Sequence, residues 1–174
     1  MARTEKIDYK KIIADKRLEA GRLMTEEQIA QCNIAIHTAS VASGLSGFIP
    51  VPVADAIPIS AAQITMVVAL GNIFNQSVSD SAAKGIIGAA ASTFVGRNLI
   101  KFIPIAGWFV SAAVAAGVTE AIGWMVATDF AKQARTEWER KKNAADAANA
   151  YAEAEKIKRK VNLSNEDAED FSDS

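Results

Sequence analysis

The chain has 174 residues, 50% of them hydrophobic, and a formal net charge of −1 at pH 7. This length allows one domain with a sizeable core plus tails, and the near-zero charge gives no general attraction to nucleic acid. Cys32 is the only cysteine, which excludes an intramolecular disulfide and a cysteine metal cluster and fits a reducing compartment.

The charges are concentrated in two flanks around an apolar centre. From Ile29 to Ala131 the only charged residues are Asp55, Asp80, Lys84, Arg97, Lys101, Glu120 and Asp129. The N-terminal residues lack the apolar core of a secretory signal. The shifts in composition predict four segments: an N-terminal amphipathic helix (1–24), an apolar helical bundle domain (25–131), a polar helical extension (132–161) and an acidic disordered tail (162–174).

A capping signal separates the first two predicted helices. In Thr25-Glu-Glu-Gln28, the Thr25 hydroxyl can accept the Gln28 amide while the Gln28 side chain reaches back, which is the pattern that starts a helix. We expect this second helix to end near Gly44 or Gly47. His37 lies on it without a carboxylate or cysteine partner, so we expect a buried, hydrogen-bonded core or interface residue rather than a metal ligand or base.

A run with three prolines, Phe48 to Pro58, interrupts the helices. Proline fixes φ, removes a donor and pushes the preceding residue toward extended backbone. The next helix should therefore begin with Asp55 as its cap and Pro58 in its first turn, and reach Phe74. Gln63 lies on an otherwise apolar surface of this helix. Because a buried amide needs partners, we expect it to hydrogen-bond to another helix.

Two more helices follow. Ser77 and Asp80 form a predicted acidic capping pair for a helix that reaches about Phe102. After a break at Pro104, the last helix begins near Trp108 and has no proline to stop it before the polar extension. Its small residues recur every four positions, which allows close helix approach; they are Gly107, Ser111 and Ala115 in one row and Ala113, Gly117 and Ala121 in the next.

Similar helix lengths and short turns predict an all-α, up-down four-helix bundle. Antiparallel neighbours bring together residues equally far from their shared turn. With turns centred on the two breaks, this arithmetic predicts a contact between Asp55 and Arg97 and another between Lys84 and Glu120.

The patterns that carry chemistry are missing from the sequence. There is no phosphate-binding glycine loop, and one histidine and one cysteine cannot make a usual zinc site. The central carboxylates lie on separate elements, without the pairing that general acid–base catalysis requires. We therefore predict no enzyme, no cofactor and no nucleic-acid partner.

Helices that are apolar nearly all round favour a membrane over a soluble bundle. Basic residues in both flanks then place both termini in the cytoplasm, with membrane lipid as a partner. The alternative location is the cytoplasm itself, with the chain a soluble bundle whose apolar interior binds lipid.

Five motifs follow one another in an order that resembles a known family. They are Ile49-Pro-Val-Pro-Val-Ala-Asp55, then Gln63 and Met66, a small-residue helix, Leu99-Ile-Lys-Phe-Ile-Pro-Ile-Ala-Gly107, and an alanine- and glycine-rich helix. Over residues 29–133 this order resembles the bacterial YcjF-like GTPase-associated membrane domain family, a domain of unknown function. Members are often fused after an Era-like GTPase domain, which this sequence lacks. The resemblance implies a membrane-associated helical module that anchors or regulates a partner, with a GTPase supplied in trans. The alternative is a self-assembling, homo-oligomeric or pore-forming membrane protein.

Overall fold

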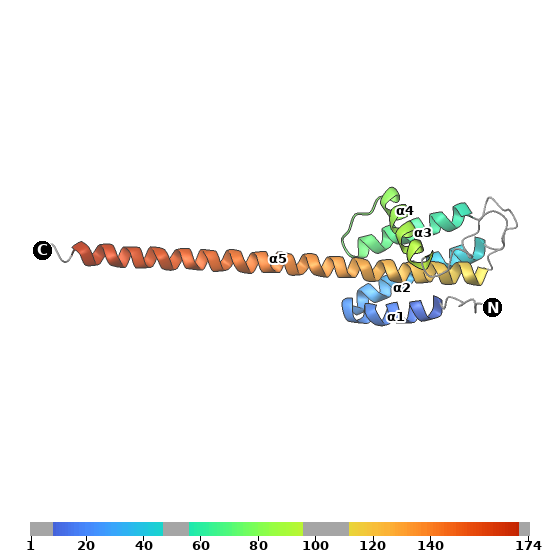
Figure 1. The fold of residues 1–174 in the computed structure, drawn as a ribbon, viewed down its shortest axis with the longest axis horizontal. Helices are drawn as coiled ribbons and strands as arrows, with labels where there is room; N and C mark the ends of the chain where they lie inside the picture. Colours follow the sequence, from blue (N-terminus) through green and yellow to red (C-terminus); the bar gives the residue numbers. More distant parts are fainter. Residues whose placement is uncertain (1–8, 47–55, 96–111, 171–174) are drawn as a thin grey trace. The chain divides into compact units, whose positions relative to one another are not determined.

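The computed structural model describes residues 9–46, 56–95 and 112–170. They form α1 (Tyr9–Leu23), α2 (Glu26–Ser46), α3 (Ala56–Ile73), α4 (Asp80–Val95) and α5 (Ala112–Asp170), drawn in Figure 1. The all-α prediction is therefore confirmed. The chain divides into two units, Met1–Ala134 and Arg135–Ser174, close to the predicted change in composition at Lys132.

The predicted capping box starts α2. The Gln28 amide donates to Thr25 Oγ1 at 3.2 Å, and the Thr25 amide donates to Gln28 Oε1 at 3.0 Å, so two amides at the helix start find partners. The predicted beginning of the next helix is also confirmed, because α3 starts at Ala56 with Pro58 in its first turn. Asp55, its predicted cap, lies outside the described residues.

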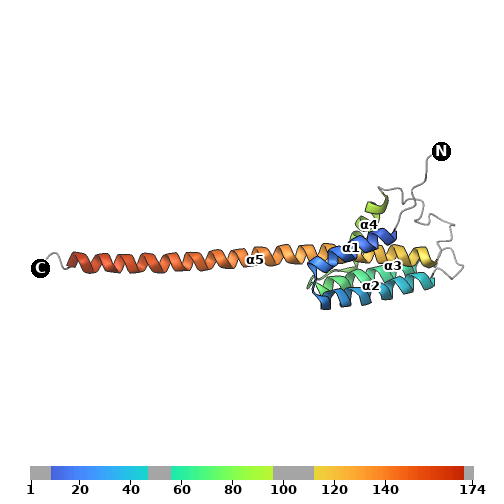
Figure 2. The same cartoon turned by 90° about the horizontal axis from the view of Figure 1, so that it is seen from below.

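The core of the first unit forms where α2, α3 and α5 meet. Figures 1 and 2 show α1 to α4 gathered around the beginning of α5. Trp124 is fully buried there, and its indole Nε1 has no hydrogen-bond partner among the described residues. At Gly123 a Cβ would lie 2.7 Å from Ile36 Cγ1 and 2.9 Å from the Met66 sulfur. A helical glycine thus lets side chains of α2 and α3 reach the α5 backbone.

The amphipathic helix α1 packs along α5. The Tyr9 ring occupies the space that a Cβ at Gly117 would need, so one of the predicted small residues does serve close approach. Eight residues further along α1, the Arg17 guanidinium lies 5.2 Å from the centroid of the Trp124 ring. This geometry gives a cation–π attraction that covers the buried indole.

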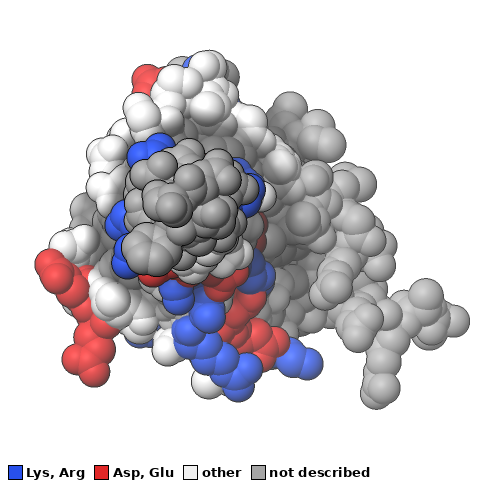
Figure 3. All heavy atoms as spheres, turned by 90° about the vertical axis from the view of Figure 1, so that its left-hand side faces the viewer, with Lys and Arg blue, Asp and Glu red and all other residues white. Residues whose placement is uncertain are grey.

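An ion-pair cluster joins the other end of α1 to α5. Glu19 pairs with Lys132 and, at 2.7 Å, with Lys16 of its own helix. The hydrogen bond from Lys132, followed by that from Lys16, lowers the pKa of Glu19, and the same bond to Glu19 raises the pKa of Lys132. Charges of both signs lie next to one another on this protein, as Figure 3 shows for one face. Because both partners are partly exposed, the pair contributes at most about 1 kcal/mol.

The acidic tail differs from its prediction. Helix α5 continues to Asp170. The prediction that the tail is disordered is therefore wrong for residues 162–170. Extending an existing helix adds one hydrogen bond per residue without a new nucleation cost. Residues 171–174 lie outside the described range.

Two other expectations concern the arrangement of the helices. Helix α3 packs against both α2 and α4, but residues 96–111 between α4 and α5 lie outside the described residues, and the up-down order stays a prediction. In the described ranges no helix is both long and apolar enough to cross a bilayer.

Candidate functional site

The connection from α3 to α4 forms one wall of the candidate site. Asn75, two residues after the end of α3, has a φ of 55°. The Gln76 amide donates to the Gly71 carbonyl at 2.9 Å, and the Asn75 amide donates to the Asn72 carbonyl at 3.1 Å. These two bonds make a Schellman motif, in which asparagine is the usual substitute for glycine at the left-handed position. The chain therefore leaves α3 in a fixed direction.

Gly71 is required by that geometry. A Cβ at this position would lie 2.6 Å from Val78 Cγ2 and 2.8 Å from the Gln76 carbonyl oxygen. The connection folds back onto the last turn of α3, and only a residue without a side chain leaves enough room.

Ser79 starts α4. Its hydroxyl accepts the Ala82 amide at 3.3 Å, and its carbonyl accepts the Ala83 amide at 2.8 Å, which defines an N-cap. The predicted capping role of Ser77 is wrong, because the serine two residues later takes it. Asp80 does lie in the first turn, where its charge complements the helix dipole.

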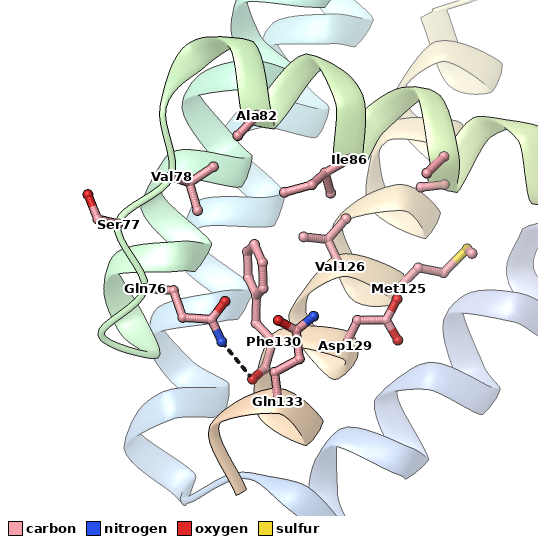
Figure 4. Close-up of a pocket in the computed structure, with 12 residues that line it drawn as sticks. Gln76, Ser77, Val78, Ala82, Ile86, Met125, Val126, Asp129, Phe130 and Gln133 are labelled. Atoms are coloured by element: carbon pink, nitrogen blue, oxygen red, sulfur yellow. Dashed lines mark hydrogen bonds between the residues drawn. The ribbon is translucent and has the colours of Figure 1, made fainter. Parts of the chain in front are cut away.

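An open hollow of about 500 Å³ lies between this connection, α4 and α5. We call it the α4–α5 hollow. Its apolar lining consists of Val78, Ala82, Ile86, Ala89, Ala90, Met125, Val126 and Phe130. Its polar lining consists of Gln76, Ser77, Asp129 and Gln133. In Figure 4 the Phe130 ring points from α5 toward Val78 and Ile86.

One hydrogen bond ties the connection to α5. The Gln76 side-chain amide donates to the Phe130 carbonyl at 3.3 Å (Figure 4). The lining contains neither histidine nor cysteine, and Asp129 is its one carboxylate. The hollow therefore offers apolar contact and hydrogen bonding to a ligand rather than acid, base or nucleophile chemistry.

Gln63 makes the predicted contact between helices. Its half-buried amide donates to Thr119 Oγ1 at 3.2 Å, which joins α3 to α5, and Thr119 is fully buried. The prediction that His37 is buried in the core is wrong, because it is exposed on α2; a role for it in an interface stays a prediction. The core-facing side of α2 is taken by Cys32, Ile36, Ala39, Ser40 and Ser43. His37 follows Ile36 by about 100° around the helix and so turns away from the core.

The predicted ion pair between Lys84 and Glu120 does not form. In the described chain Lys84 is exposed, Glu120 is half-buried, and no ion pair joins them. Ala82 and Ile86 of α4 line the hollow opposite α5 residues 125–130. Lys84 is thus roughly 10 Å along α5 from Glu120 at 1.5 Å per residue. The predicted pair of Asp55 and Arg97 falls outside the described residues.

Metal and thiol chemistry have little support in the described part of the chain. No group of three or more His, Cys, Asp or Glu side chains is placed there to hold a metal ion. Burial raises the pKa of the Cys32 thiol to about 11, so this thiol stays protonated at neutral pH and is a poor nucleophile.

Comparison with known proteins gives no match to a family model, to a curated protein or to a solved structure. The resemblance to the GTPase-associated domain family therefore stays an expectation from the sequence. The functional argument rests on the hollow and on the exposed surfaces of the helices.

Proposed function

We propose that the protein is a non-catalytic helical module that holds a partner protein in the α4–α5 hollow. The lining of the hollow carries this proposal, because an apolar floor is bordered by amide and carboxylate groups. Such a surface accepts apolar side chains of a partner helix, while the polar groups fix its orientation. In this proposal α2 to α5 form the up-down bundle, and a GTPase supplied in trans is the partner that the family resemblance implies.

Site-specific photo-cross-linking in cells tests the docking site. A photoreactive residue at Ile86, which lines the hollow, should give a discrete adduct with a second protein. The matched control is the same residue at Lys84, which lies on the same helix but is exposed and not part of the lining. We expect at least about tenfold more adduct at position 86 than at position 84, because only position 86 faces a partner in the hollow.

A filling variant completes the test. Ala82 is exposed and lines the hollow, so Ala82→Trp should occupy the space without disturbing the core and should abolish the adduct at position 86. Equal adducts at positions 84 and 86, or an adduct that persists in Ala82→Trp, would contradict the proposal.

A second observation favours association with a membrane surface. Helix α2 buries one side in the core, yet Ile34, Val41 and Leu45 on its other side are 68%, 47% and 63% exposed. No Asp, Glu, Lys or Arg occurs between Ile29 and Ser46. Large apolar side chains on the exposed side of an uncharged helix are often covered by a partner or a membrane. We therefore propose that this outer face of α2 lies in the interfacial layer of a bilayer.

Vesicle flotation measures this association. The protein should float with neutral phosphatidylcholine vesicles, and Ile34→Gln with Leu45→Gln should lower the partition coefficient at least tenfold, because two apolar side chains contribute up to about 1.5–3 kcal/mol each. Leu18→Gln is the control, since Leu18 is 64% exposed but lies on α1. An unchanged partition coefficient in the double variant, or a wild-type chain that does not float, would exclude this face as the membrane contact.

A further inference from the structure

The second unit, Arg135–Ser174, carries exposed apolar side chains. Every side chain described in it, from Arg135 to Val161, is exposed. Tyr151, Ile157 and Val161 are 77%, 58% and 51% exposed. Ile157 and Val161 are four positions apart and so lie on the same side of the helix, where a partner helix would cover them.

Five apolar residues of this unit follow a seven-residue repeat. Ala147, Ala154 and Val161 are seven positions apart, and Ala150 and Ile157 follow the first two of them by three positions. These are the a and d positions of a coiled coil, which lie on one side of a helix and face the partner helix. We call this surface, formed by the five residues, the heptad face.

The charges beside the heptad face identify its occupant. In this register Glu153 is at position g and Lys158 is at the following position e. In a parallel two-stranded coiled coil, position g of one helix faces the next position e of the other. A second copy therefore brings Glu153 against the partner's Lys158, and the symmetry repeats this pair.

Both charges are available for such pairing. The ion pairs along this part of the helix join Arg135 to Glu139 and Glu137 to Lys141, before the repeat begins. In the described chain neither Glu153 nor Lys158 takes part in an ion pair. We propose that the heptad face pairs in parallel with the heptad face of a second copy of this chain.

Sedimentation of the full chain and disulfide cross-linking test this pairing. The chain of 18.5 kDa should sediment at twice that mass. Ala154→Cys places a thiol at position a, where two parallel helices meet, and should cross-link under mild oxidation. Ala152→Cys is the matched control, because Ala152 is also exposed but lies at the outer position f. The native Cys32 is buried with a raised pKa and does not compete.

We expect at least tenfold more cross-linked dimer from Ala154→Cys than from Ala152→Cys. Glu153→Lys should raise the dissociation constant about tenfold by opposing like charges, and adding Lys158→Glu should restore it, because the exchange re-forms both pairs. These positions are exposed in the single chain, so its helix content should not change. A single-chain mass at tens of micromolar, equal cross-linking at positions 152 and 154, or failure of the exchange to restore pairing would overturn the proposal.

Discussion

Replacing Trp124 with alanine will lower the free energy of unfolding by about 3–5 kcal/mol. Trp124 is the largest fully buried side chain of the core, and the Arg17 guanidinium lies 5.2 Å from its ring centroid. Truncation removes this apolar burial and the cation–π contact, and it leaves a cavity that the surrounding helices only partly close. The loss is measured by urea-induced unfolding that is monitored through hydrogen exchange of the α2 and α3 backbone amides.

Trp138→Ala is the matched control, because Trp138 is 62% exposed on the same helix. Its effect should stay within about 0.5 kcal/mol. Trp124→Phe should cost less than Trp124→Ala, since it leaves a smaller cavity and removes the indole N–H that lacks a partner among the described residues. Equal losses for Trp124→Ala and Trp138→Ala would show that α5 does not pack into the core as described.

Two glycine-to-alanine substitutions should change stability in opposite directions. Gly71→Ala should lower the free energy of unfolding by about 1–3 kcal/mol, because the new Cβ would meet Val78 and the Gln76 carbonyl at 2.6 and 2.8 Å. The obstacle includes backbone, so a rotamer change cannot relieve it. Thermal unfolding followed by circular dichroism measures the effect.

Gly85→Ala is the control for this substitution. Gly85 is exposed within α4, and a Cβ there would meet nothing within 4 Å. Alanine should therefore raise the free energy of unfolding by about 0.5–1 kcal/mol through helix propensity and a less flexible unfolded chain. Stabilisation by Gly71→Ala would mean that the connection does not fold back onto α3.

The parts of the fold that could be predicted depend on short-range signals. Thr25 and Gln28 satisfy each other's amides within one turn, so four residues are enough to locate the start of α2. Pro58 likewise restricts the first turn of α3 through its own ring. The sequence predicts that Gln63 hydrogen-bonds to another helix, because a buried amide requires a partner. It does not identify Thr119 as that partner.

The candidate site depends on contacts between residues far apart in the sequence. Phe130 and Val78 line one hollow although more than fifty residues separate them, and no local pattern encodes that meeting. The Lys84–Glu120 prediction failed for the same reason, because it assumed a register between α4 and α5 that side-chain packing decides. The one local signal that could have been used is Asn75, since asparagine after an apolar helix predicts a left-handed C-terminal residue.

The short connection between α3 and α4 is held at both of its ends, by the Schellman bonds at Asn75 and by the Ser79 cap. Its middle is tied to α5 through Gln76. Hydrogen bonds therefore hold one wall of the hollow in place, and binding as we propose it would not have to order these residues at about 1–2 kcal/mol each. A ligand that matches the shape of the hollow would contact this wall without distorting it. A ligand of a different shape would make fewer contacts, because the wall would have to break its hydrogen bonds to adjust. If a partner binds there as we propose, the fixed shape of this wall would determine which partner fits.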